Sequence, residues 1–69
     1  MKLNLKELRK AARYSQQTLS NASGVSRESI ARYELGLQVP TLESAVRIVS
    51  VLGCTVDDLL KDNTREETR

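Results

Sequence analysis

Apolar residues recur along this chain at intervals of three and four positions, the spacing of one buried face of an α-helix. No stretch has a convincing strand pattern. The spacing predicts five short helices, over residues 5–12, 16–23, 27–34, 42–52 and 56–60. Because the connections between them are short, we expect an all-α fold in which the helices form one compact domain.

Each predicted helix is preceded by a polar residue that can cap its N-terminus. The expected caps are Asn4, Ser15, Ser26, Thr41 and Thr55. Asn4 with Glu7 and Thr55 with Asp58 have the spacing of a capping box, in which two side chains and two backbone N–H groups bond reciprocally. Three helices are followed by a glycine, where a left-handed backbone often ends a helix. These glycines are Gly24, Gly36 and Gly53.

The inward positions of the five helices define the expected core. They are Leu5, Leu8, Ala12, Leu19, Ala22, Ile30, Leu42, Ala45, Ile48, Val49, Leu52, Val56, Leu59 and Leu60. A length of 69 residues allows one domain, which we expect to occupy residues 1–61. Residues 62–69 contain no apolar residue and are expected to form a disordered polar tail.

The composition argues against several classes of protein. The chain has no His and a single Cys, so neither a metal site nor an internal disulfide is expected, and no cofactor is implied. We expect Cys54 to be a buried, inert thiol in a cytoplasmic protein. No apolar run approaches the roughly 18 residues of a membrane span. Short helices rarely enclose a catalytic pocket, so we expect a binding module and not an enzyme.

The charge is distributed unevenly along the chain. Residues 1–34 carry seven basic and three acidic side chains, whereas residues 35–69 carry four basic and six acidic ones. A basic half favours a polyanionic partner such as nucleic acid. Within it, residues 16–35 hold a helix, a turn at Gly24 and a second helix. This is the spacing of a helix-turn-helix, although helical hairpins without a DNA role share it.

The residues in and around this window resemble a known family. They are the run LKELRKAARYSQQTLSNASGVSRESIARYE, the PTLES segment and the LGCTVDDLL ending. They resemble the lambda-repressor-like, Cro-type helix-turn-helix family (xenobiotic-response-element type) over about residues 3–60. The most specific parts are SQ-x-x-L at 15–19, GVS at 24–26 and I-x-x-x-E at 30–34. The resemblance implies a phage or bacterial regulator, usually a repressor, that binds double-stranded DNA as a symmetric homodimer in the cytoplasm or nucleoid.

The resemblance also implies roles for individual residues. Base edges would be read by Arg27, Glu28 and Arg32, whose alternative role is an ordinary solvated helix face. Arginine can bond guanine and glutamate can accept from cytosine, so a preference for G·C pairs is expected. Phosphate contacts are expected from Ser15, Gln16, Gln17, Ser26, Arg13 and Lys10. Arg9 and Glu34 match the positions of an internal ion pair that joins the first and third helices.

The sequence departs from its family in three places. Ser20 replaces the usual alanine in the contact between two helices, where little effect is expected because its hydroxyl can bond back to a carbonyl. The family often has glycine at the position of Arg13, so a positive φ there would strain this residue by about 1 kcal/mol. The loop after Glu34, often basic in the family, has no positive charge and carries Leu35, Leu37 and Val39. Leu37 and Val39 either pack under the fourth helix or form a dimer or partner surface, in which Val46 and Val51 would extend it. A competing function is therefore a protein-interaction module such as an antitoxin, which binds a partner protein through residues 35–39.

Overall fold

The computed structural model describes residues 3–61 and confirms the predicted class: all five elements are helices. They are α1 (Leu5–Ala11), α2 (Gln16–Ser23), α3 (Arg27–Leu35), α4 (Leu42–Leu52) and α5 (Val56–Leu60). The helix boundaries agree with the predicted ranges to within one residue. The polar tail predicted at 62–69 lies outside the described residues.

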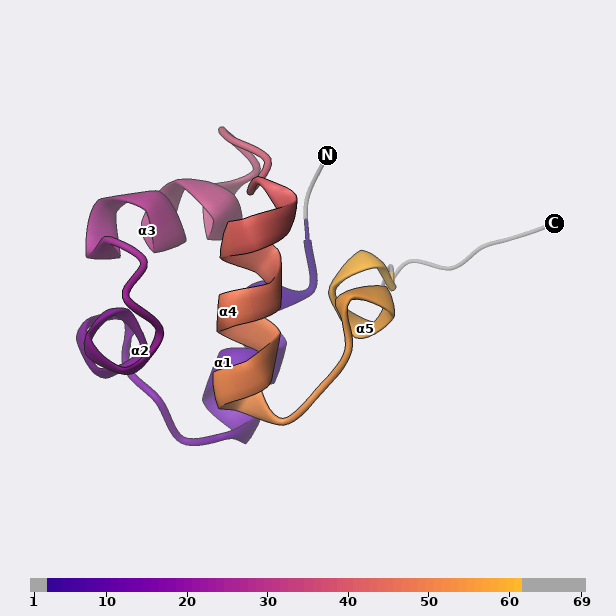
Figure 1. Cartoon of the computed structure of the whole chain (residues 1–69). Coiled ribbons are helices and arrows are strands. Elements are labelled where there is room, and N and C mark those ends of the chain that lie inside the picture. Colours follow the sequence, from indigo (N-terminus) through magenta and orange to yellow (C-terminus); the bar gives the residue numbers. More distant parts are fainter. Residues whose placement is uncertain (1–2, 62–69) are drawn as a thin grey trace, which may run out of the picture.

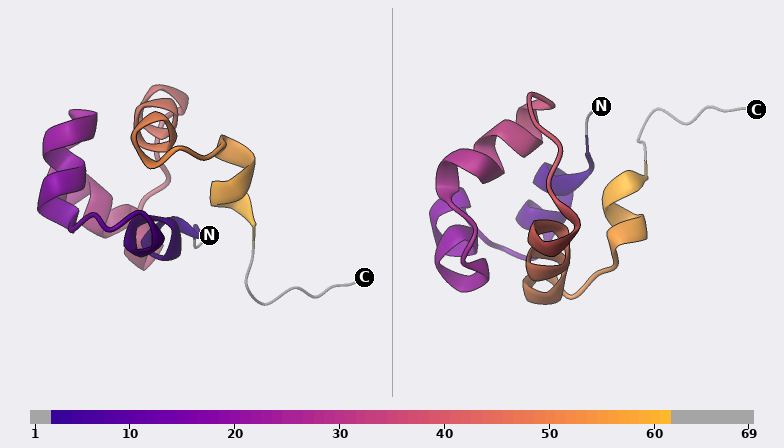
Figure 2. Two further views of the ribbon diagram at one scale, coloured as in Figure 1. Left: turned by 90° about the horizontal axis from the view of Figure 1, so that it is seen from below. Right: turned by 45° about the horizontal axis from the view of Figure 1, so that its top comes forward.

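Helix α4 is the central element of the fold. In Figure 1, α2 and α3 lie to one side of α4, α5 lies to the other and α1 lies behind it. Two further views in Figure 2 keep α5 on the far side of α4 from α2. The helix pairs that pack most closely are α2 with α3, α2 with α4, α4 with α5, and α1 with α3. The α2–α3 pair therefore packs against the rest of the domain through both helices, α2 against α4 and α3 against α1.

The core forms where these helices meet. Its buried apolar residues are Leu3, Leu5, Leu19, Val25, Ile30, Tyr33, Ala45, Ile48, Val49 and Leu59, and Leu8, Leu52, Cys54 and Val56 pack against it. Most of the predicted inward positions are thus confirmed. Burying such apolar side chains contributes roughly 1.5–3 kcal/mol each relative to leaving them exposed.

Three predicted core positions are wrong. Ala22 is exposed, because α2 turns the other flank of Leu19 inward and buries Ser23. Leu42 is 74% exposed, since it begins α4 at the edge of the helical layer. Leu60 is 51% exposed, because adjacent residues point about 100° apart on a helix and its neighbour Leu59 occupies the core position.

Four of the five predicted N-caps are confirmed. The hydroxyls of Ser15, Ser26, Thr41 and Thr55 each accept the backbone N–H three residues further on. The Thr55–Asp58 capping box is also present. Asn4 is different: its side chain makes no capping bond, so the predicted pairing with Glu7 is wrong. Its backbone is not extended, and its N–H instead donates to the carbonyl of Leu59 at 2.9 Å.

Cys54 is partly exposed, so the expectation of a fully buried thiol is wrong. It packs against the core in the connection between α4 and α5. Burial raises the pKa of this thiol, and the neighbouring Asp58 carboxylate raises it further. Both effects favour the protonated thiol at neutral pH.

Candidate nucleic-acid interface

The turn between α2 and α3 is held by short-range contacts. Gly24 adopts the left-handed conformation (φ 78°) and its N–H donates to the carbonyl of Ser20. The buried hydroxyl of Ser23 accepts the N–H of Val25 at 3.2 Å. Val25 is buried between the helices, as are Leu19 and Ile30. These contacts therefore fix the angle at which α3 leaves α2.

The outer side of α3 carries the three residues predicted to read bases. Arg27, Glu28 and Arg32 are all exposed. None of the three takes part in an ion pair within residues 3–61. Ser26 caps the helix by accepting the Ser29 N–H at 3.1 Å, so its hydroxyl is already engaged. The outer side of α3, from its first turn to its last, thus offers two guanidinium groups and one carboxylate to an approaching ligand.

The N-terminus of α2 is the second part of the candidate interface. Ser15 Oγ accepts the Thr18 N–H at 3.0 Å, and Thr18 Oγ1 accepts the Ser15 N–H at 2.9 Å. This reciprocal pair is a capping box that the sequence did not predict, because threonine stands where glutamate or glutamine is usual. Gln17 is exposed and donates to Asn21 on its own helix at 3.0 Å. The positive end of α2 is a favourable place for an anion.

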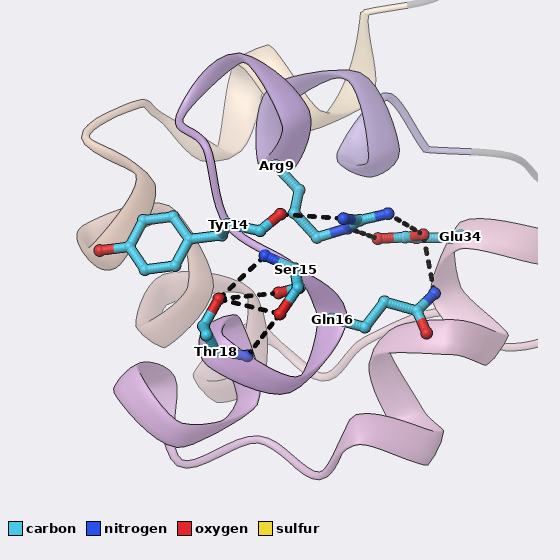
Figure 3. Close-up of polar contacts among 6 residues, drawn as sticks. All are labelled: Arg9, Tyr14, Ser15, Gln16, Thr18 and Glu34. Atoms are coloured by element: carbon cyan, nitrogen blue, oxygen red, sulfur yellow. Dashed lines mark hydrogen bonds and ion pairs between the residues drawn. The ribbon is translucent and has the colours of Figure 1, made fainter.

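Gln16 is placed differently from its neighbour. Its Nε2 donates to Glu34 Oε1 at 3.0 Å, and so joins α2 to α3 (Figure 3). The sequence predicts a phosphate contact for Gln16 but gives no sign of this bond, because 18 residues separate the partners. One signal was available: a carboxylate has more acceptor sites than a single arginine fills.

Arg9 and Glu34 form the ion pair that the resemblance implied. Arg9 Nε lies 2.6 Å from Glu34 Oε2, and Arg9 Nη2 donates to Oε1 at 3.2 Å. The third bond of the guanidinium runs from Nη1 to the carbonyl of Tyr14 at 2.9 Å. Both side chains are almost fully buried, with 11% and 4% exposure. Figure 3 shows that this network joins α1, the α1–α2 connection and α3.

Lys10 and Arg13, the two cations predicted to contact DNA phosphates, lie around the end of α1. Lys10 is exposed in the last turn of α1, and its carbonyl accepts the Arg13 N–H at 3.0 Å. Arg13 is exposed and has φ 66°, so the positive φ considered above is present. Within residues 3–61 it is the only residue other than glycine with a positive φ.

The last residue of α3 and the loop between α3 and α4 are apolar and exposed, and Leu35, predicted to begin the loop, ends the helix instead. Leu35 is 69% exposed, Leu37 73% and Val39 59%, so the alternative in which Leu37 and Val39 pack under α4 is wrong. Val39 borders a groove of about 260 Å³ between the loop, α4 and α5. The groove is lined by Leu3, Val39, Pro40, Leu42, Ala45, Val56, Leu59 and Leu60. We call residues 35–39, Leu42 and Leu60 the apolar surface.

Two features of the described residues bear on other kinds of site. Across residues 3–61, no three His, Cys, Asp or Glu side chains are arranged to hold a metal ion. In the same part of the chain, no helix combines the length and apolar character that crossing a bilayer requires.

The arrangement described above defines the class of structure: two short helices joined by a tight glycine turn, with the second presented outward, form a helix-turn-helix. A sequence model described as helix-turn-helix matches residues 5–59 of the chain. The chain belongs to the Cro/C1-type (xenobiotic-response-element type) helix-turn-helix family. This family comprises transcriptional regulators and not enzymes.

Curated relatives in Bacillus subtilis (strain 168) agree with this assignment. The chain is 33% identical to the "Uncharacterized HTH-type transcriptional regulator YqaE" over 93% of its length and 55% of that protein. It is 35% identical to the SPbeta prophage-derived HTH-type regulator YonR over 83% of its length and 53% of that protein. It is 37% identical to the HTH-type regulator YgzD over 86% of its length and 89% of that protein. The chain thus spans about half the length of the first two relatives.

Proposed function

We propose that the chain binds double-stranded DNA sequence-specifically and acts as a small transcriptional regulator, namely a repressor. In this proposal α3 enters the major groove of a pseudo-palindromic operator. The observation that carries it is the outer side of α3, where Arg27, Glu28 and Arg32 are exposed and free of ion pairs within the described chain. Arginine can bond guanine O6 and N7, and glutamate can accept from cytosine N4.

The DNA backbone is held, in this proposal, by residues at the end of α1, at the start of α2 and at the start of α3. These are Ser15, Gln16, Gln17, Ser26, Arg13 and Lys10. The positive end of α2 supports this role, because backbone N–H groups there lack helical partners. Ser15 and Ser26 act through the backbone they cap, since their hydroxyls already accept N–H groups. Lys10 and Arg13 add attraction that carries no sequence information.

Selection from a random duplex library with the purified chain at low salt tests the DNA-binding proposal. We expect an inverted repeat with G·C pairs in each half-site and with half-site centres about 34 Å apart. A selected site made only of A·T pairs would contradict the roles of Arg27 and Arg32. Weak, uniform binding with no enriched motif would overturn sequence-specific recognition.

We further propose that the operator is read by a homodimer that buries the apolar surface. The exposure of Leu37, Val39 and Leu42 supports this, because isolated small domains seldom leave such residues grouped in solvent. A two-fold dimer would use the same surface on both copies. Leu37→Asp is expected to shift the chain from dimer to monomer in sedimentation and to leave thermal unfolding of the monomer unchanged. An unchanged dimer fraction would remove the apolar surface from the interface.

The second candidate is a protein-interaction module, such as an antitoxin, with DNA binding secondary. The same exposed loop and groove favour it, since they are suited to an apolar partner surface. Salt dependence separates the two functions, because phosphate binding weakens steeply with salt whereas an apolar contact does not. The DNA proposal therefore predicts a steep fall in duplex affinity between low and physiological salt.

A further inference from the structure

The two glutamines that begin α2 are held in different ways. Gln16 Nε2 donates to the carboxylate of Glu34, a residue that is 5% exposed. Gln17 Nε2 donates to Asn21 on the exposed side of α2. A side chain anchored to a buried group has less rotamer freedom to lose when it binds a ligand than one that is free in solvent. Gln16 therefore has less rotamer freedom to lose than Gln17 when it binds a ligand.

The carboxylate that holds Gln16 is itself fixed. Arg9 approaches Glu34 with two nitrogens, at 2.6 and 3.2 Å. The same guanidinium donates to the carbonyl of Tyr14 in the connection that leads into α2. Glu34 belongs to α3, the helix proposed to read bases. One buried carboxylate thus sets the position of the first residue of α2 relative to α3.

The amide of Gln16 remains open to a ligand. An amide nitrogen has two N–H groups, and the bond to Glu34 uses one of them. A recess of about 310 Å³ lies beside it, lined by Lys6, Arg9, Gln16, Ala31, Glu34 and Leu35. Lys6 is exposed on the recess and belongs to none of the ion pairs formed within residues 3–61. The recess therefore combines a cation, an unused N–H and the start of α2, all of which favour an anionic oxygen.

We propose that Glu34 is a positioning residue for binding of the DNA backbone. By accepting one N–H of Gln16, it directs the other toward a phosphate of the duplex. This inference rests on the DNA-binding function proposed above and goes beyond the structural role of the Arg9–Glu34 pair. It predicts that the contribution of Gln16 to DNA affinity depends on Glu34, whereas the contribution of Gln17 does not.

A double-mutant cycle tests this dependence. The background variant replaces the ion pair by apolar residues, Arg9→Met with Glu34→Leu, because swapping a whole buried pair avoids an unpaired charge and is often neutral for folding. In the wild type, Gln16→Ala should weaken binding to the selected duplex about fivefold per contact, the equivalent of one hydrogen bond of about 1 kcal/mol. In the apolar background the same change should weaken it less than twofold. Gln17→Ala, the matched control, should have the same effect in both.

A second readout follows the phosphate directly. Single phosphates of the duplex are replaced one at a time by neutral methylphosphonates. One position in each half-site should weaken wild-type binding about fivefold. The same replacement should have a smaller effect, about twofold or less, on Gln16→Ala and on the apolar background, because only the charge attraction of Lys6 and of the start of α2 remains. A purely structural ion pair would leave this phosphate sensitivity unchanged in a folded apolar variant.

The outcomes separate the two proposals. If Gln16→Ala lowers duplex affinity as much in the apolar background as in the wild type, the positioning role is overturned. The proposed function still stands in that case, because the wild type binds the duplex. If the wild-type chain binds no duplex at low salt, the proposed function and the positioning role both fall. If circular dichroism shows the apolar background unfolded, the cycle is run on Arg9→Met with Glu34→Gln, which leaves no unpaired charge and keeps a weaker neutral acceptor for Gln16. The loss on Gln16→Ala should then fall to about twofold, and a loss of fivefold would again overturn the inference.

Discussion

Glu34→Ala should be among the most destabilising single substitutions in this chain. The change removes both oxygens that Arg9 approaches, at 2.6 and 3.2 Å, and the acceptor of the Gln16 amide at 3.0 Å. Arg9 would keep one bond, to the carbonyl of Tyr14. Its guanidinium, only 11% exposed, would then be a buried charge without a counter-ion.

The expected loss follows from that unpaired charge. Removing one partner of a buried ion pair costs about 3–5 kcal/mol. At roughly 0.05–0.15 kcal/mol per residue, a chain of this length has a total free energy of unfolding of only about 3–10 kcal/mol. The variant should therefore be largely unfolded at room temperature or melt at least about 12 °C below the wild type.

Urea and thermal unfolding followed by circular dichroism measure this difference. The matched control is Glu43→Ala, since Glu43 also pairs with an arginine, Arg47, at 2.8 Å but on the exposed side of α4. Its loss should stay within about 0.5 kcal/mol. The reasoning is refuted if Glu34→Ala unfolds within about 1 kcal/mol of the wild type, because the buried charge would then cost almost nothing.

Two further substitutions test the strained and the titrating parts of the fold. Arg13→Gly should raise the melting temperature, because it relieves about 1 kcal/mol of backbone strain at φ 66°. It should also reduce the salt dependence of duplex binding by about one phosphate contact. A lower melting temperature would contradict the strain at Arg13. The Thr55 backbone bond and the Lys61 side chain hold the pKa of Asp58 below its ordinary value of 3.8, so its stabilising contribution is present above that value and is lost as the pH falls through the lower, folded-state pKa. Asp58→Asn should therefore flatten the acid end of the stability–pH curve, and an unchanged acid limb would count against this contribution.

The helices could be predicted from the sequence because their signals are local. Helical spacing, the hydroxyl caps and the glycines that follow α2, α3 and α4 each involve residues within a few positions of one another. The wrong predictions arise where packing between helices decides which residues face the core. Whether Ala22 or Ser23 faces inward depends on how α2 is rotated against α3 and α4, and no local pattern specifies that rotation.

The candidate site was predictable as a set of residues but not as a set of contacts. The resemblance supplied Arg9 and Glu34 as a pair, and the structure has this pair. The bond from Gln16 to Glu34 could not be predicted, because it depends on where the first residue of α2 comes to lie against α3. Exposure of Leu37 was left open by the sequence, since an apolar residue in a loop can turn either way.

The bond between the Asn4 N–H and the Leu59 carbonyl brings the two ends of the described chain together. It seats the segment before α1 beside α5, and Figures 1 and 2 place α5 on the opposite side of α4 from α2. A fluorescent label or a fusion partner attached near either end would therefore leave the domain from the same side, away from α2. The domain can accordingly be tethered, immobilised or linked in tandem through either end while the α2 side stays open.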